Sequence, residues 1–281
     1  MNLIKINTEN VYCLGDLHGS FLDIKYFVTS HDIKDSVLIF CGDIGMGFNK
    51  PEYYKQIFKK LNRKLKKQNV YVLFLRGNHD SPEDFNNELY KSSNIKTLED
   101  YTIISINDEF NILCVGGAIS IDRMSRKHQM TQQAFSYMRF HNSSFEEAIK
   151  EVPQLYWENE APFFNRQKMN EIFENNIKIN AVCSHTCPYF CEPRTKDGIK
   201  EWLKYDSTLE KDLDNERNTM TFIYNDLMEN KHPIKKWCYG HFHYHNFEEI
   251  NGIDFHLIDM DRNGRMDYVE LYRKKDENIV S

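Results

Sequence analysis

The chain has 281 residues and a formal net charge of −6, and 41% of its residues are hydrophobic and 14% aromatic. This composition excludes a disordered chain, and the acidic balance does not favour a nucleic-acid partner, which requires a clustered basic surface. No stretch approaches the roughly 18 apolar residues that span a bilayer, and no secretory signal is visible, so we expect a cytoplasmic globular protein without a membrane partner.

Three short apolar runs open the chain, and each ends in Gly-Asp or Gly-Asn. They are VYCLGD at 11–16, VLIFCGD at 37–43 and VYVLFLRGN at 70–78. Continuous apolar runs of this length are typical of strands that are buried on both faces of a sheet. Helix-like segments at about 20–31 and 51–68 separate them, so the first third of the chain is predicted to form successive β-α-β units.

The rest of the chain continues this α/β pattern, with one exception. Further strands are predicted at 101–106, 111–117, 180–185 and 235–241, with a hairpin turn near Asn251-Gly252. Residues from about 122 to 177 carry no convincing strand, and the segments SSFEEAIKEV and NRQKMNEIFENN favour helices. We therefore predict a single α/β domain over 1–281, with a helical insertion or lid at about 122–177.

The seven cysteines are interpreted as structural. Most of them lie in strand-like runs, where they can act as small buried hydrophobic residues in a reducing cytosol. Cys183, Cys187 and Cys191 are spaced C-x3-C-x3-C, which raises the alternative of a metal cluster. That spacing differs from those of common zinc and iron–sulfur sites, and Pro188 interrupts it, so we favour the structural interpretation.

Polar side chains stand at the ends of five predicted strands. They are Asp16 and His18 in GDLHG, Asp43 in GDIGMG, Asn78, His79 and Asp80 in GNHD, His185 in SHTCP, and His241 and His243 in GHFH. Each piece alone is weak, because a single histidine after a strand is often structural and Gly-Asp is a common turn. Together they indicate a site, because the carboxyl ends of strands in an open α/β sheet converge on one crevice.

The composition of this group points to metal ions. Burying so many ionisable groups without a compensating cation would be costly. Imidazole nitrogens together with carboxylate and amide oxygens suit zinc, manganese or iron. The sequence therefore predicts a centre that binds two divalent metal ions.

The motif series GDLHG, GDIGMG, GNHD, SH and GHFH resembles, in order and residue type, the five-motif signature of the calcineurin-like metallophosphoesterase family. These motifs extend from residue 15 to 243. The segments GGAISIDRMSR (116–126) and YWENE (156–160) are also similar to segments of some bacterial and phage members. The resemblance implies a four-layer α/β/β/α sandwich of two mixed sheets, with two metal ions (Mn, Fe or Zn) at one edge.

The resemblance also implies a role for each motif residue. One metal ion would be held by Asp16, His18 and His243, the other by Asn78, His185 and His241, with Asp43 bridging the two. His79 corresponds to the catalytic histidine of the family that binds no metal. Asp80 is expected to support either that histidine or its loop. The implied reaction is hydrolysis of a phosphate ester by a hydroxide that the two metal ions share.

The second motif departs from one branch of the family. Serine/threonine phosphatases and dinucleotide polyphosphatases carry Gly-Asp-x-x-Asp-Arg-Gly, whereas this chain has Met46 and Gly47 at the positions of that Asp and Arg. The chain therefore lacks the acid that would orient His79 and the arginine that would bind phosphate. Arg123 and Arg126 are the candidate substrate-binding replacements, and the alternative is that each forms a structural or surface salt bridge.

A phosphate monoester carries one more negative charge than a diester, so the missing arginine favours a phosphodiester or a nucleotide-like small phosphoester as substrate. The alternatives are a phosphomonoesterase or protein phosphatase, a nuclease whose insertion supplies a basic channel, and a non-catalytic scaffold of the same fold. The scaffold is disfavoured because all seven ligand positions and His79 are filled. The sequence carries no signal for an oligomeric state.

Overall fold

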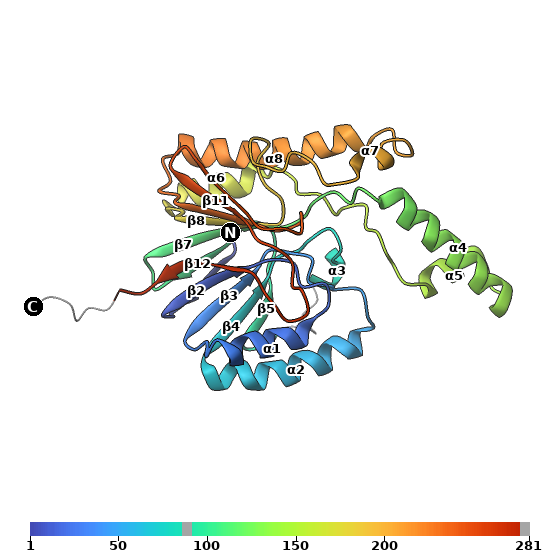
Figure 1. The fold of residues 1–281 in the computed structure, drawn as a ribbon, viewed down its shortest axis with the longest axis horizontal. Coiled ribbons are helices and arrows are strands. Elements are labelled where there is room, and N and C mark those ends of the chain that lie inside the picture. The colour runs from blue at the N-terminus through green and yellow to red at the C-terminus, as the bar shows by residue number, and fades with distance from the viewer. Residues whose placement is uncertain (86–91, 276–281) are drawn as a thin grey trace, which may run out of the picture.

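The computed structural model describes residues 1–85 and 92–275, and its strands form two sheets that pack face to face between layers of helices (Figure 1). The five-stranded sheet has the order β12 (Tyr268–Arg273), β2 (Asn10–Leu14), β3 (Ser36–Phe40), β4 (Val70–Phe74), β5 (Ile95–Thr97). Its central strands are parallel, and β12 is antiparallel to β2. The three apolar runs that open the chain are thus neighbours in one sheet, as predicted.

The second sheet has seven strands and is also mixed. Its order is β1 (Leu3–Ile6), β6 (Thr102–Ile106), β7 (Phe110–Val115), β8 (Ala181–Ser184), β9 (Lys236–Tyr239), β11 (Ile253–Leu257), β10 (Asn246–Ile250). The strands β7, β8, β9 and β11 run parallel, while β10 and β11 form the hairpin predicted at Asn251-Gly252. The two mixed sheets confirm the predicted fold class.

Helices cover the outer faces of both sheets (Figure 1). The five-stranded sheet carries α1 (Phe21–Ser30) and α2 (Pro51–Gln68), and the seven-stranded sheet carries α6 (Arg166–Glu174) and α8 (Leu209–Glu229). Two short helices, α3 (Pro82–Phe85) and α7 (Ile199–Trp202), lie in connecting segments. Helix α2 begins with Pro51 in its first turn, where a proline costs no hydrogen bond, and ends at the left-handed Asn69.

Residues 122–177 form three helices and no strand. Helices α4 (Arg123–His141) and α5 (Phe145–Glu151) pack against each other and project away from the sheets (Figure 1). A capping box at Ser144 and Glu147 fixes the start of α5. Helix α6 instead returns to the body beside α8, so only the α4–α5 pair projects. The role of this segment as a lid stays a prediction.

All seven cysteines are buried and free. Cys183 lies in the core between the two sheets, together with Cys13, Cys41, Cys114 and Cys238. Cys187 and Cys191 lie in the other core, between the seven-stranded sheet and its helices. The C-x3-C-x3-C series is therefore divided between two cores, which agrees with the structural interpretation.

Candidate dinuclear metal centre

The site forms in the tight loops that follow β2, β3, β4, β8 and β9. Four of its residues have left-handed backbone, with φ of 46° at His18, 47° at Asp43, 72° at His241 and 62° at His243. Such residues cost of order 1–3 kcal/mol each and persist only where the surroundings over-determine them. The loops also pack very closely. A side chain at Gly77 would clash, since its Cβ would lie 2.0 Å from Asp43 Oδ1. The backbone is thus strained and closely packed where the polar side chains converge.

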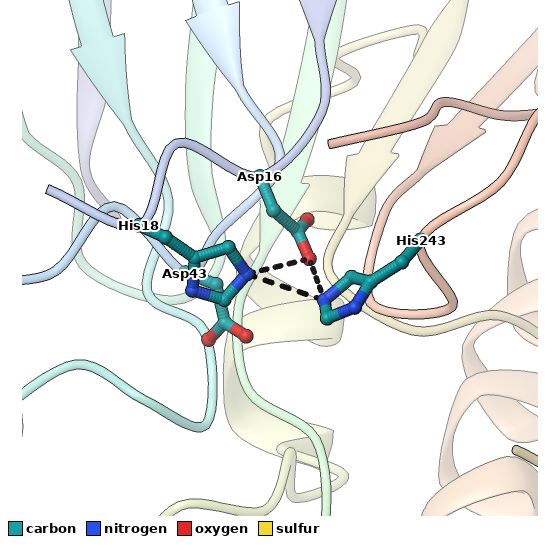
Figure 2. A group of neighbouring side chains, drawn as sticks. All are labelled: Asp16, His18, Asp43 and His243. Carbon is teal, nitrogen blue, oxygen red and sulfur yellow. Dashed lines mark hydrogen bonds and ion pairs between the residues drawn. The ribbon is translucent and has the colours of Figure 1, made fainter. Parts of the chain in front are cut away.

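The first group of side chains contains Asp16, His18, Asp43 and His243, whose potential ligand atoms all lie within 4.8 Å of one another. Asp16, His18 and His243 face one another (Figure 2). His243 Nε2 lies 3.1 Å from Asp16 Oδ2 and 3.2 Å from His18 Nε2. Asp16 and Asp43 are buried, while the two histidines are half-buried. The group can therefore hold one divalent cation that stays accessible from outside.

The second group shares Asp43 with the first. Asp43, His185 and His241 lie close enough to hold a second ion, and all three are buried. His185 Nε2 is 3.4 Å from Asp43 Oδ1 and 3.0 Å from Asn78 Oδ1, so the amide oxygen of Asn78 faces the same point. The structure thus brings all seven predicted ligand residues together, in two groups that meet at one carboxylate.

The electrostatics of the buried groups fit cations at this place. Burial opposes ionisation of Asp43, but His79 and His185 hold the pKa of this carboxyl well below its usual range. Burial also lowers the pKa of His185, and Asp43 and Asp16 outweigh that effect and raise it to about 9. Asp43 Oδ2 is buried and accepts no hydrogen bond from the described residues. An ionised carboxylate with a free oxygen, surrounded by imidazoles, is a suitable bridge between two metal ions.

His79 lies beside these groups without belonging to either. Its backbone N–H donates to Asp43 Oδ1 at 2.8 Å, and its Nε2 is 3.4 Å from Arg126 Nη2. Its Nδ1 is buried and has no hydrogen-bond partner among the described residues. Burial lowers the pKa of His79 to about 4, with Arg126 and Lys196 adding to this effect and Asp43 opposing it. The imidazole is therefore neutral near pH 7 in the free protein.

Asp80 contacts the loop and not the ring of His79. Its carboxylate accepts backbone N–H groups from Ile44, Gly45, Met46 and Gly77 at 2.8 to 3.1 Å. Burial and Asp43 raise its pKa to about 7, whereas these four donors favour the ionised form. Asp80 thereby ties the loop after β3 to the loop after β4, and these loops carry Asp43 and Asn78. Asp80 is expected from its motif to support either His79 or its loop, and these contacts correspond to support of the loop.

Three buried residues that the sequence did not assign to the site orient Asn78. The amide Nδ2 of Asn78 donates to Ser120 Oγ at 2.8 Å, and Ser120 donates from Oγ and from its backbone N–H to Glu160. Glu216 of α8 accepts from the neighbouring N–H of Ile119. Because its amide nitrogen is engaged, Asn78 turns its oxygen toward His185. Glu160 lies in YWENE, so its only signal in the sequence was the similarity of that segment to family members.

The two candidate arginines lie in different surroundings. Arg126 bonds Asp122 through Nε and the backbone oxygen of Leu155 through Nη1, and its Nη2 faces His79. Arg123 is buried and donates to Asp206, Thr208 and Asp212. Its contacts connect the start of α4 to the segment that precedes and begins α8. The substrate-binding role of Arg123 stays a prediction, and these ion pairs favour the structural alternative.

Gly47 has no space for the arginine that it replaces. A Cβ at this left-handed residue would lie 2.9 Å from the Cβ of Ser81 and 3.0 Å from the ring of Trp157. Met46 is completely buried in the core. Trp157 is also buried, so it packs against this loop and does not present its ring to a substrate. The second motif therefore offers no positive charge to a phosphate.

Lys196 is a further residue at the site that the sequence analysis did not assign to it. Its Nζ lies 3.5 Å from His241 Nδ1, and its charge contributes to lowering the pKa of His241, after burial. It belongs to the loop between β8 and α7, which has no repeating pattern and no strand end nearby. A single lysine in such a loop carries no signal that places it at the centre.

Comparisons with known proteins agree with the fold and the motifs. The family model of calcineurin-like phosphoesterases matches residues 10–245. One solved structure aligns over 94% of this chain and 95% of its own, with a TM-score of 0.52 and 14% identity, and so shares the fold. No curated protein matches the sequence.

Two further solved structures are similar at lower scores. A protein of Thermus thermophilus has a TM-score of 0.49 and 12% identity over 94% of this chain and 100% of its own. A dimetal phosphatase from Danio rerio has a TM-score of 0.45 and 11% identity over 90% of this chain and 88% of its own.

The helices of residues 1–85 and 92–275 include none with the length and apolar character that crossing a membrane requires. The family match covers most of the chain and contains every motif residue discussed above. The chain belongs to the calcineurin-like phosphoesterase family, and it is a metal-dependent hydrolase of phosphoester bonds.

Proposed function

We propose that the two groups of side chains hold one divalent metal ion each. The first ion would be bound by Asp16, His18 and His243, the second by Asn78, His185 and His241, with Asp43 shared between them. The observation that carries this proposal is the position of Asp43, which belongs to both groups and has a buried carboxylate oxygen that accepts no hydrogen bond from the described residues. Manganese, iron and zinc all suit this set of ligands.

Bound at these positions, the two ions would supply Lewis-acid polarisation of a phosphoryl group and a water molecule of lowered pKa. Residues of the chain supply proton transfer, positive charge and the positioning of the loops. His79 is neutral in the free protein; it would take up a proton from water at Nε2 when the phosphate anion binds and pass it to the leaving oxygen of the ester, and Arg126 places a positive charge beside it. Asp80 keeps the two loops in register, and Ser120 and Glu160 keep the amide of Asn78 turned toward its ion.

For the substrate, we propose a small phosphodiester or nucleotide-like phosphoester. The support is the second motif, where Gly47 and Met46 provide no cation for the extra charge of a monoester. A phosphomonoesterase is the second candidate, because Arg126 lies next to His79 and supplies one such charge. A cytoplasmic location is retained as well, supported by the seven free cysteines.

The test compares an aryl phosphate with the matching bis-aryl phosphate at the same metal loading and pH. We expect kcat/KM to be higher for the diester. A tenfold difference corresponds to about 1.4 kcal/mol of transition-state stabilisation and is a suitable threshold. If kcat/KM for the monoester exceeds that for the diester by more than this factor, the protein would instead be assigned as a phosphomonoesterase.

A further inference from the structure

Lys196 places a positive charge beside the site. Among the described residues, no carboxylate lies within ion-pair distance of its ammonium group, whereas Arg126 is paired with Asp122. Lys196 is half-buried, and its Nζ lies 3.5 Å from Nδ1 of His241. A partly desolvated ammonium without a counter-ion attracts an anion much more strongly than an exposed, paired lysine does.

A cavity of about 520 Å³ opens next to this lysine. Its walls include Lys196 and Asp197 on one side and Phe242, His243 and Tyr244 on the other. His243 belongs to the first group of metal-binding side chains, and Lys196 contacts His241 of the second. The cavity therefore adjoins the first group through His243 and lies next to the second through Lys196, and its volume lies in the range of small-molecule sites.

The aromatic residues give the cavity a specific character. Phe242 packs edge-on against His241, with ring centroids 4.9 Å apart, and its ring is therefore fixed relative to the centre. Tyr244 is 40% exposed and leaves part of its ring open to a ligand. Asp197 adds an exposed acceptor that can receive hydrogen bonds from hydroxyl or amino groups. A positive charge, an open ring and an acceptor suit a phosphate joined to a ring-bearing group with hydrogen-bond donors.

We propose that Lys196 binds the phosphoryl group and that the adjoining cavity receives the ester substituent, which makes this a specificity site for a nucleoside phosphate. The inference rests on the proposed function and narrows its substrate to the nucleotide-like branch. Lys196 places one positive charge beside the site from the loop after β8. The open ring of Tyr244 stacks on the base.

The first experiment measures inorganic phosphate binding to the metal-loaded protein by calorimetry, which needs no turnover. Lys196→Gln is expected to weaken phosphate binding by about tenfold or more, the loss of one charge-assisted contact. Lys196→Arg should retain most of the affinity. The control is Lys200→Gln, which removes an exposed lysine four residues further along and should change nothing. Elemental analysis of each variant should find the same two metal ions.

The second experiment tests the cavity. Tyr244→Ala is expected to raise KM for a nucleoside phosphodiester several-fold while leaving KM for a dialkyl phosphate, which has no ring, unchanged. Tyr205→Ala, which removes an exposed tyrosine on another segment, is the control. Equal effects of Tyr244→Ala on both esters would refute base stacking.

Two results would overturn the role of Lys196. One is unchanged phosphate affinity in Lys196→Gln, and the other is an altered metal content, which would mean that Lys196 acts on the metal position through His241. Failure of the proposed function looks different. In that case no ester is hydrolysed by the wild-type protein, while the dependence of phosphate binding on Lys196 can still be measured.

Discussion

His79 is the residue whose surroundings differ most from what its motif implies. In the branch with Gly-Asp-x-x-Asp-Arg-Gly, an acid is available to orient the corresponding histidine. Here Met46 occupies that position, and His79 Nδ1 is buried without a partner among the described residues. The ring is held instead from its other side, where Nε2 lies 3.2 Å from Asn78 Nδ2 and 3.4 Å from Arg126. Its orientation therefore depends on Asn78, which we propose as a metal ligand, and on a helix that projects from the body.

At this scale we predict that His79→Asn retains two metal ions per chain but lowers kcat by roughly 10²- to 10⁴-fold, the usual contribution of a positioned proton-transfer group. The reason is that its ring faces the site without belonging to either group of metal-binding side chains. Elemental analysis and steady-state kinetics on the same preparation make the measurement. Loss of metal would identify His79 as a ligand, and normal turnover of an ester with a poor leaving group would remove its acid role.

At the scale of elements, buried carboxylates connect segments that are far apart in the sequence. Glu160 binds the segment after β7 through Ser120, and Glu216 of α8 binds the same segment through Ile119 and also accepts from Thr186, next to His185. Both carboxyl groups are buried, and burial is the main cause that raises the pKa of each. Two acids that share one buried segment make its stability sensitive to pH.

We predict that Glu160→Gln removes part of the pH dependence of unfolding in the metal-free protein. Burial, with a contribution from Glu216, raises the folded pKa of Glu160 to about 8, from a model-compound value of 4.5. The folded state therefore holds a proton that the unfolded state releases. The wild-type protein should lose stability as pH rises from about 4.5 to 8, by at most about 1.4 kcal/mol per pH unit.

The measurement is the unfolding free energy of wild type and Glu160→Gln across this pH window, from denaturant titrations. Glu158→Gln, which changes an exposed acid two residues away, is the matched control and should follow the wild type. Parallel profiles for wild type and Glu160→Gln would show that Glu160 is already ionised in the folded protein.

On the scale of the whole molecule, the sequence predicts the features that depend on a local pattern of apolar residues. The strands that end in Gly-Asp, Gly-Asn or Gly-His are mostly apolar, so both their burial and the meeting of their ends could be inferred. The structure adds β1, β5 and α8, which the sequence analysis did not single out. β1 and β5 are only four and three residues long, too short to show a period of their own.

The contacts that surround the ligands were beyond sequence reasoning for a different reason. Ser120, Glu160 and Lys196 reach the site from irregular segments, whose course is decided by tertiary packing and not by hydrophobic periodicity. The separation of Arg123 from Arg126 is of the same kind. They are three residues apart at the start of one helix, and only the packing of α4 against its neighbours decides which one faces His79.

The convergence of both sheets on one carboxylate leads to the last prediction. Asp43 joins loops of the five-stranded sheet to His185 and His241 of the seven-stranded sheet, so metal binding should stabilise the sandwich as a unit. An ion that binds only the folded state adds about 2.7 kcal/mol to the free energy of unfolding at a hundredfold excess over its Kd.

We expect Mn²⁺ to raise Tm and a chelator to reverse the shift. Asp43→Asn should abolish most of the shift and weaken both ions, whereas Asp108→Asn, on an exposed turn, should preserve it. Two ions bound to Asp43→Asn with unchanged affinity would disprove the bridge, because a carboxylate that serves one ion only cannot couple the two positions.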